Sequence, residues 1–497
     1  MLPLALLLLG ALAALWVWGV PLLRQSKLHL PPRVPGFLHQ FRPNLPNHLL
    51  RLAQAHGPLY RIHFGNQDVV ILNSKELIQE AMIKNWLNFA GRPLTFSSKL
   101  VSLGGKDLSL GNYSPAWKDL KKLTRSALLF GMRNKMEPLV WQLTHQLCED
   151  FRAQPGSAVD LFQEFSRLTN RIVCTLTFGE MEESTLQDLY DCITELVPLW
   201  ASPSISILDV FPFLRFVPYP ALRRVKTLLK IRDGIIREQM RRHRETQAAG
   251  VVRDLMDYML RELREKSGVW DVTEENLHMV LLDLVIGGTE TTAATLTWVV
   301  LYLLHHPEIH RRLQEELDQE LGPGRVSGSD PPASPLPYKD RERLPLLNAT
   351  ISEVLRLRPV VALGLPHRTL KDSSLGGFDI PGDTIVIPNL YGAHHDAAVW
   401  DQPFAFRPDR FLNPKSQQPL TFGCGARVCL GEIPARLEIF LILTQLLHRF
   451  TFSPVPPSAA AAAAALPSLV PDFGILVKAQ PFRVHLLPRE GGRRAAA

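Results

Sequence analysis

Apolar and polar positions follow two different patterns along this chain, and each pattern predicts a different kind of element. Leu59–Phe64 and Val69–Leu72 flank a four-residue polar turn, which is typical of a hairpin. Most of the remaining body repeats apolar residues every three to four positions, the period of a helix with one buried face. The helices predicted in this way are Ser74–Lys84, Pro115–Phe130, Pro138–Phe151, Leu161–Phe178, Pro220–Arg244, Leu255–Leu263, Thr273–His306, Pro307–Leu321, Leu346–Leu357 and Leu430–Leu447. Short apolar runs in the last third, such as Thr384–Pro388, predict a few strands. The fold class is therefore mainly α with a small β part.

The first 23 residues carry no charge and are long enough to cross a bilayer as a helix. Basic residues follow this segment and none precedes it, which favours a retained membrane anchor with a cytoplasmic body over a cleaved signal peptide. We divide the chain into an anchor at 1–23, a proline-rich linker at 24–36, a body at 37–488 and a flexible tail at 489–497. The alanine run at 459–465 between two prolines predicts a surface loop.

Composition narrows the class of protein. The chain has 497 residues, of which 46% are hydrophobic and 21% charged, which excludes disordered, collagenous and polytopic membrane proteins. The net charge of +7 fits an acidic protein partner or an anionic membrane surface and is weak support for nucleic-acid binding. Five cysteines are too few for a disulfide framework at this length, so we expect a reducing compartment.

The segment from Phe422 to Gly431 holds the strongest chemical signal. A helix beginning directly after Cys429 places its sulfur at a helix N-terminus, where free N–H groups stabilise a thiolate. Gly425 and Gly431 leave room for a flat cofactor to approach the backbone, and Arg427 suits an anionic group on that cofactor. Cys424 and Cys429 lack a second ligand pair, so the spacing argues against a closed zinc site, and we expect Cys424 to pack in the interior.

The pattern Phe-x-x-Gly-x-Arg-x-Cys-x-Gly resembles the haem-thiolate signature of the cytochrome P-450 superfamily at every fixed position. The resemblance implies the fold of that family, a single large haem-binding domain, with Cys429 as the iron ligand of haem b. It also implies that Glu353 and Arg356 join Arg410 in a buried structural network. Alone, Glu-x-x-Arg would be an ordinary helix surface pair.

The run Gly287-Gly288-Thr289-Glu290-Thr291-Thr292 interrupts the longest predicted helix with residues that weaken helices. We expect a local opening there, because such a helix would otherwise avoid this sequence. In the resembled family, the residue at Thr291 holds iron-bound oxygen and the acid at Glu290 serves the proton relay. Haem propionate contacts are implied for Arg92, Trp117, Lys121, Arg125, His367 and Arg427, with lysine at 121 where the family has arginine.

No Gly-x-Gly-x-x-Gly turn follows a predicted strand, so reducing equivalents must come from another protein. In the family this is NADPH–cytochrome reductase, a diflavin protein, acting on an enzyme that sits on the endoplasmic reticulum membrane. Further segments, Phe89–Pro93 and Asp107–Gly111 among them, resemble the members that hydroxylate steroids with O2. That likeness implies substrate contacts for Arg232, Asp283 and Ile475. The alternatives are a microsomal member of different regiochemistry, such as a 17α-hydroxylase or a xenobiotic oxidiser, and a haem sensor without enzymatic activity.

Overall fold

Every predicted helix has a counterpart in the structure, which also has helices that were not predicted, α9 Glu183–Trp200 and α2 Leu45–His56 among them. The computed structural model describes residues 28–489, except 37–38, 40–41, 65–66, 155, 248–250, 267, 323–335, 414 and 456–465. The predicted anchor and the alanine run therefore lie outside the described residues. The α-helices are α2 Leu45–His56, α3 Lys75–Gln79, α4 Trp86–Phe89, α5 Phe96–Val101, α6 Pro115–Gly131, α7 Glu137–Ala153, α8 Leu161–Phe178, α9 Glu183–Trp200, α10 Pro203–Val210, α11 Pro220–Thr246, α12 Leu255–Glu265, α13 Glu274–His305, α14 Pro307–Leu321, α15 Pro345–Leu357, α16 Leu390–His394 and α17 Glu432–Arg449.

The strands form four small sheets. In the largest, β1 is antiparallel to β2, β2 is parallel to β7, and β4 is antiparallel to β7. The others pair β3 and β8 with β11, β5 with β6, and β9 with β10. The strand bounds are β1 Leu59–Phe64, β2 Gln67–Leu72, β3 Ala158–Val159, β4 His367–Arg368, β5 Ser373–Leu375, β6 Phe378–Ile380, β7 Ile385–Pro388, β8 Phe450–Pro454, β9 Pro471–Phe473, β10 Val477–Ala479 and β11 Val484–Pro488. The prediction of a mainly α fold with a small β part is confirmed.

Helix α13 is the centre of the molecule. Its first turn is fixed by a capping box in which Thr273 and Asn276 exchange hydrogen bonds, and Pro307 begins the next helix, α14, directly after it. Helix α8 packs along it, and α15, α17 and β10 also contact it. Among the described residues, α13 alone is long and apolar enough to span a membrane, but most of it is buried inside the protein. It is a core helix.

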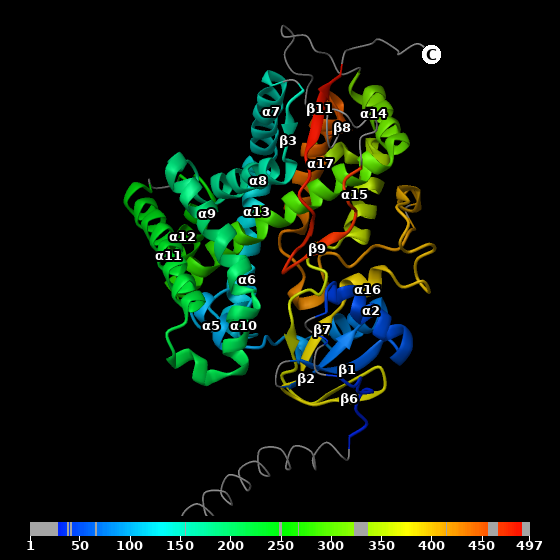
Figure 1. Cartoon of the computed structure of the whole chain (residues 1–497). Helices are drawn as coiled ribbons and strands as arrows, with labels where there is room; N and C mark the ends of the chain where they lie inside the picture. The colour runs from blue at the N-terminus through cyan, green and yellow to red at the C-terminus, as the bar shows by residue number, and fades with distance from the viewer. Residues whose placement is uncertain are drawn as a thin grey trace, which may run out of the picture.

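Figure 1 shows how the small sheets are placed around this helix. Strands β1, β2 and β7 gather with α2 at the lower end of the view, while β3, β8 and β11 lie at the opposite end beside α7, α14 and α17. Helices α9, α11 and α12 form the left side. The cysteine segment leads into α17, so it lies between the large sheet and the α13 core.

One helix prediction needs correction. The predicted helix Ser74–Lys84 changes at Glu80 from an α-helix to a π-helical turn, Glu80–Lys84, and a second π-helical turn, Met132–Met136, links α6 to α7. The described part of the predicted linker is hydrogen-bonded to the body, because the N–H of Arg61 donates to Pro32 O and that of Val34 donates to Arg61 O, both at 2.8 Å. Arg489, placed in the predicted tail, pairs with Asp318 at 2.6 Å.

Candidate haem site

The cysteine loop is held by its own backbone. The N–H of Cys429 donates to Phe422 O at 3.0 Å, and the N–H of Val428 donates to Gly425 O at 3.2 Å. Helix α17 begins at Glu432, two residues later than predicted, and Gly431 caps it. A Cβ added to Gly431 would meet only the Cys429 sulfur, at 3.6 Å, and Cys429 itself is exposed. The loop therefore presents a free thiol toward open space.

Gly425 serves a different purpose from the one its position predicts. It has a φ of +72°, and a Cβ there would stand 1.7 Å from the carbonyl oxygen of Met82. Met82 belongs to the π-helical turn Glu80–Lys84. The close approach that requires glycine at 425 is thus between two backbone segments of the protein, and the expectation that Gly425 makes room for a cofactor is corrected.

The state of the Cys429 thiol also differs from the prediction. Although the residue is exposed, the surrounding protein raises the pKa of Cys429 by burial, and the hydrogen bond from the Gly431 N–H only partly offsets this rise. The helix N-terminus does not by itself produce a thiolate in the isolated chain. Bonding to a metal would supply the missing stabilisation, because the ligand form of cysteine is the thiolate.

Helix α13 carries the Gly-Gly-Thr-Glu-Thr-Thr run without a break. The distorted helix predicted here is not seen, because the α13 backbone is continuous from Glu274 to His305. Gly287 is exposed and an added Cβ would meet nothing within 4 Å, whereas Gly288 packs on Val173. The Thr291 hydroxyl donates to Gly287 O at 2.6 Å. The open space predicted here therefore comes from the absence of a side chain at Gly287, next to the Thr291 hydroxyl, and not from a distortion of the helix.

Glu290 points elsewhere. It is buried, and its Oε1 accepts a hydrogen bond from Lys478 Nζ of β10 at 3.0 Å. Glu290 and Thr291 are adjacent in the sequence, but the Glu290 carboxylate binds Lys478, a residue that the sequence pattern did not indicate.

Three cationic side chains and a histidine ring meet at the edge of the cysteine loop; we call Arg92, Lys121, His367 and Arg427 the cationic cluster. The guanidinium of Arg92 donates to the carbonyls of Ser109, Leu365 and Pro366, each at 2.9 Å. That of Arg427 donates to the carbonyls of Ala90, Leu108 and Gly111 at 2.7–3.0 Å. Lys121 Nζ donates to Ala426 O, and His367 Nδ1 lies 2.7 Å from Phe89 O.

These groups are held together against their mutual repulsion. Burial lowers the pKa of Arg427 to about 8, and the nearby charge of Arg92 adds to this. Burial lowers the pKa of Arg92 to about 10, opposed by Asp107. Burial also lowers the pKa of His367 well below its usual value, with further contributions from Arg92 and Arg427. An anionic group bound here would relieve this repulsion, so the cluster fits the two propionates of a haem.

Trp117 and Arg125 take different places relative to this cluster. Trp117 is buried, donates its indole N–H to Leu108 O at 3.0 Å, and lies under the Arg427 guanidinium at 4.0 Å from the ring centroid. Arg125 is exposed on α6 and reaches Lys121 only through the repulsion of their charges. Of the predicted propionate contacts, the structure brings all except Arg125 to the buried cluster.

The predicted substrate contacts lie in two places. Arg232 on α11 is buried, with Nη1 donating to Val101 O at 3.0 Å, and with Nε and Nη2 lying 2.8 and 2.7 Å from Asp233 Oδ1. It is therefore not a solvated member of the basic α11 surface. Ile475 is half-buried in the turn between β9 and β10.

Asp283 has the partners that a buried acid requires. Its oxygens accept hydrogen bonds from the Leu108 N–H and from the Ser109 hydroxyl, both at 2.7 Å. The Ser109 hydroxyl oxygen also lies 2.9 Å from Asp107 Oδ2, and its one hydrogen can be donated to only one of the two carboxylates at a time. The other oxygen of Asp107 is buried without a partner. Burial raises the pKa of Asp283 to about 7, and the charge of Asp107 adds to this rise. Sequence reasoning missed Asp107 and Ser109 as partners of Asp283, because Ser109 is 174 positions away from Asp283 in the sequence.

The predicted structural trio forms a closed network. Arg356 holds both oxygens of Glu353, at 2.8 and 2.9 Å, and Arg410 Nε lies 3.1 Å from the same carboxylate. The Arg356 and Glu353 side chains are fully buried. Further N–H groups of Arg356 donate to His394 O and Pro403 O. We call these three residues the buried network.

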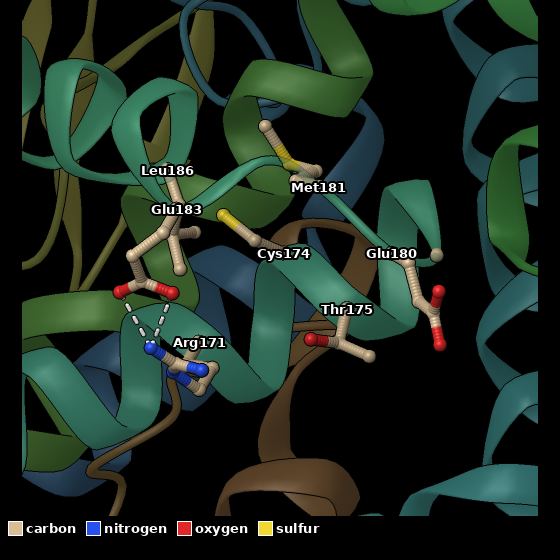
Figure 2. A pocket seen from close by; sticks show the side chains of 8 residues that line it. Arg171, Cys174, Thr175, Glu180, Met181, Glu183 and Leu186 are labelled. Atoms are coloured by element: carbon tan, nitrogen blue, oxygen red, sulfur yellow. Dashed lines mark hydrogen bonds and ion pairs between the residues drawn. The ribbon is translucent and has the colours of Figure 1, made fainter.

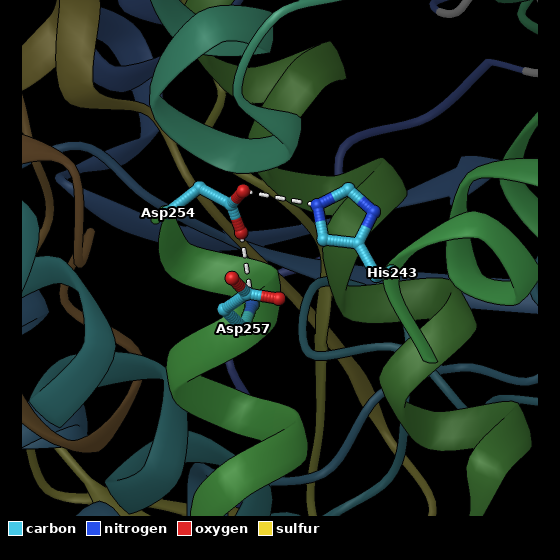
Figure 3. Close-up of side chains that lie close together, drawn as sticks. All are labelled: His243, Asp254 and Asp257. Atoms are coloured by element: carbon cyan, nitrogen blue, oxygen red, sulfur yellow. Dashed lines mark hydrogen bonds and ion pairs between the residues drawn. The ribbon is translucent and has the colours of Figure 1, made fainter. Parts of the chain in front are cut away.

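Two other features lie apart from the cleft. Figure 2 shows a surface pocket between α8 and α9, lined by Cys174, Met181 and the ion pair of Arg171 with Glu183. Figure 3 shows His243, Asp254 and Asp257 at the junction of α11 and α12. Arg253 Nε donates a hydrogen bond to Asp257 Oδ2 at 2.6 Å, and His243 Nε2 lies 2.9 Å from Asp254 Oδ2. These pairs are complete, so the group joins two helices and offers little to a metal ion.

Known proteins support the same conclusion. The cytochrome P-450 family model matches residues 29–482. A steroid 21-hydroxylase of Sus scrofa is 56% identical over 495 residues, which cover 98% of this chain and 97% of that protein. The steroid 21-hydroxylase of Homo sapiens is 55% identical over 504 residues, covering 99% and 98%. A solved zebrafish cytochrome P-450 structure with progesterone is 33% identical, with a TM-score of 0.79, covering 90% of this chain and 100% of that one. This chain belongs to the cytochrome P-450 family.

Proposed function

We propose that this chain hydroxylates progesterone and 17α-hydroxyprogesterone at C21, giving 11-deoxycorticosterone and 11-deoxycortisol in corticosteroid biosynthesis. The observation that carries this proposal is the identity of 55–56% over nearly the whole chain with several steroid 21-hydroxylases. The free thiol of Cys429, the cationic cluster and the Gly287 opening provide the site that such an enzyme needs.

The cofactor is haem b, which supplies the activation of O2 for insertion into a C–H bond. Cys429 would ligate the iron through its thiolate. Arg92, Lys121, His367 and Arg427 would hold the propionates, with Trp117 stacked beneath Arg427. The exposed Arg125 has no part in this contact, because it lies outside the buried cluster.

The protein's own residues orient the steroid and handle protons. Arg232 is buried beside Asp233, with its Nη2 2.7 Å from Asp233 Oδ1, and its guanidinium is the proposed donor to the 3-keto oxygen of a steroid. Asp283 holds the segment Leu108–Ser109 against α13, and Ile475 forms an apolar wall. On the cleft side of α13, the Thr291 hydroxyl leaves Gly287 O to move a proton, and Glu290 resupplies it.

Electrons come from NADPH–cytochrome reductase, since no dinucleotide turn is present in the sequence. We place the enzyme on the endoplasmic reticulum membrane, held by the apolar segment 1–23. A second membrane contact is supported by a group of exposed apolar side chains on and after α10, in which Phe216 is 89% exposed. The group comprises Ile207, Phe211, Phe213, Phe216 and Val217.

The test is turnover of progesterone by the full chain with the reductase, NADPH and O2. We expect 11-deoxycorticosterone as the main product. A 17α-hydroxylated product without C21 oxidation would contradict the proposed regiochemistry, and no oxidised product from a haem-loaded protein would favour a sensor or carrier. In Cys429→His, we expect loss of the thiolate-shifted band of the reduced carbon monoxide complex, and retention of that band would contradict the ligand assignment.

A further inference from the structure

The ion pair between Glu290 and Lys478 is unexplained by the site as described so far. The two residues are 188 positions apart, yet Glu290 Oε1 lies 3.0 Å from Lys478 Nζ. The Glu290 side chain is 11% exposed and that of Lys478 26% exposed. The pair therefore lies at a boundary, with its acid inside the protein and its base reaching solvent.

The position of Lys478 is fixed by its neighbours on β10. The N–H of Val477 donates to Val360 O at 2.8 Å, and the indole N–H of Trp298 on α13 donates to Val477 O at 3.0 Å. The Lys478 ammonium also lies over the ring of Phe162 on α8, at 4.7 Å. A lysine held in this way sets the direction of the carboxylate that it binds.

That direction is away from Thr291. Adjacent residues on an α-helix point about 100° apart. The Glu290 side chain points toward β10, where it binds Lys478, while the Thr291 hydroxyl donates to Gly287 O on the side of α13 where Gly287 is exposed. The carboxylate must leave the ammonium before it can serve the hydroxyl. The turn that carries Ile475 directly precedes β10, so contact between substrate and this turn can act on the pair.

We propose that Lys478 is a positioning residue that parks the Glu290 carboxylate on the solvent side of α13 and releases it toward Thr291 during turnover. This inference rests on the proton role given to Glu290 in the proposed function. At the parked position Glu290 takes a proton from water, and beside Thr291 it passes that proton to the hydroxyl, which passes its own proton into the cleft. The returning carboxylate is held again by the ammonium.

The central test is Lys478→Met, which removes the charge and keeps most of the length. An unpaired buried carboxylate stays neutral by keeping a proton, so it no longer returns to collect the next one. We expect product formed per NADPH consumed to fall severalfold, with a larger solvent deuterium isotope effect on product formation. Lys478→Arg, which keeps the cation, should recover most of the coupling.

A double variant and a matched control complete the design. Lys478→Met combined with Glu290→Gln should be no less coupled than Glu290→Gln alone, because both act on one proton path. Lys266→Met removes an equivalent lysine from the largely buried Glu262 on α12, a pair with atoms 2.6 Å apart, and should leave coupling unchanged.

The outcomes separate the two claims. If Glu290→Gln keeps full coupling, the proton role of Glu290 in the proposed function is wrong. If Glu290→Gln uncouples the enzyme but Lys478→Met does not, the role of Lys478 alone is overturned. A lower Tm with unchanged coupling in Lys478→Met would also overturn it, since that result describes a lysine that only ties β10 to α13.

Discussion

The cationic cluster and the buried network contain similar side chains in opposite electrostatic states. In the buried network, both arginines lie against one carboxylate, that of Glu353, and the charges are matched within the protein. In the cationic cluster, the guanidinium and ammonium groups donate to backbone carbonyls. Burial, with a further contribution from repulsion by neighbouring cations, lowers the pKa of Arg427 to about 8 and that of Lys121 below its usual value. The first group is complete without a ligand, and the second becomes complete when it binds one. The same residue type therefore serves the fold in one place and the cofactor in the other.

The largest effect should come from opening the buried network. Glu353→Gln leaves Arg356 and Arg410 without a counter-charge, and removal of one member of a buried ion pair typically costs about 3–5 kcal/mol. We expect this loss in the free energy of unfolding, measured by urea denaturation. The control is Glu320→Gln, which breaks the more exposed pair with Arg343 and should cost under about 1 kcal/mol.

Next in size is Arg427→Leu, in the cationic cluster. Hydrogen bonds to charged groups contribute about 1.5–3 kcal/mol, so haem should dissociate about 10–100-fold faster, measured by transfer to a haem acceptor. The haem-free chain should lose much less stability than in Glu353→Gln, because one repelling cation is gone. Equal destabilisation of the haem-free chain by both changes would contradict the contrast. Arg125→Leu, on the exposed face of α6, should retain haem normally.

A smaller effect, visible mainly through pH, should follow Asp283→Asn beside the cluster. Burial and Asp107 raise the pKa of Asp283 from 3.8 to about 7, so the neutral acid stabilises the fold fully below pH 3.8 and this contribution is lost as pH rises through about 7. The asparagine stays neutral at all these values. Free energies of unfolding from pH 4 to 8 should therefore fall less steeply in the variant. Asp188→Asn, at an exposed position of α9, should not change the slope.

The smallest effect should come from Lys121→Arg, which strengthens the cationic cluster as a ligand site and so increases its difference from the buried network. A guanidinium can hold a carboxylate by two parallel N–H bonds where the ammonium makes a point contact. Haem dissociation should slow about two- to fivefold, within the range of about 1 kcal/mol for a half-exposed pair. Faster dissociation would mean that the Lys121 bond to Ala426 O matters more than its charge.

Much of the fold was predictable because prolines and caps mark the helix ends. The predicted bounds of α8 and α14 agree with the structure, and those of α6, α7 and α13 differ by a residue or two at each end. The π-helical turn at Glu80–Lys84 was not predictable, because it shares the apolar period of the helix before it. This turn contacts Gly425, a residue remote in the sequence.

In the candidate site, too, the features set by local sequence were predictable and those set by contacts between remote residues were not. A local motif identified Cys429 and Arg427, since the chemistry of one loop requires those residues together. Lys478 was missed because its significance depends only on the carboxylate it meets across 188 positions. The effect of burial, which raises the pKa of the Cys429 thiol, could not be predicted from the position of the sulfur near a helix N-terminus.

The close contact of Gly425 with Met82 has a consequence for the order in which the molecule is made. The loop that presents the thiol rests on a turn near the start of the body, and Arg427 in that loop donates to Ala90, 337 residues earlier. During synthesis the N-terminal part folds first. The haem site cannot form at that stage, because the cysteine loop leaves the ribosome only when nearly the entire chain has been made. Capture of the cofactor is therefore a late, post-translational step, and a truncated chain ending before the loop would carry most of the helices and no means of keeping haem.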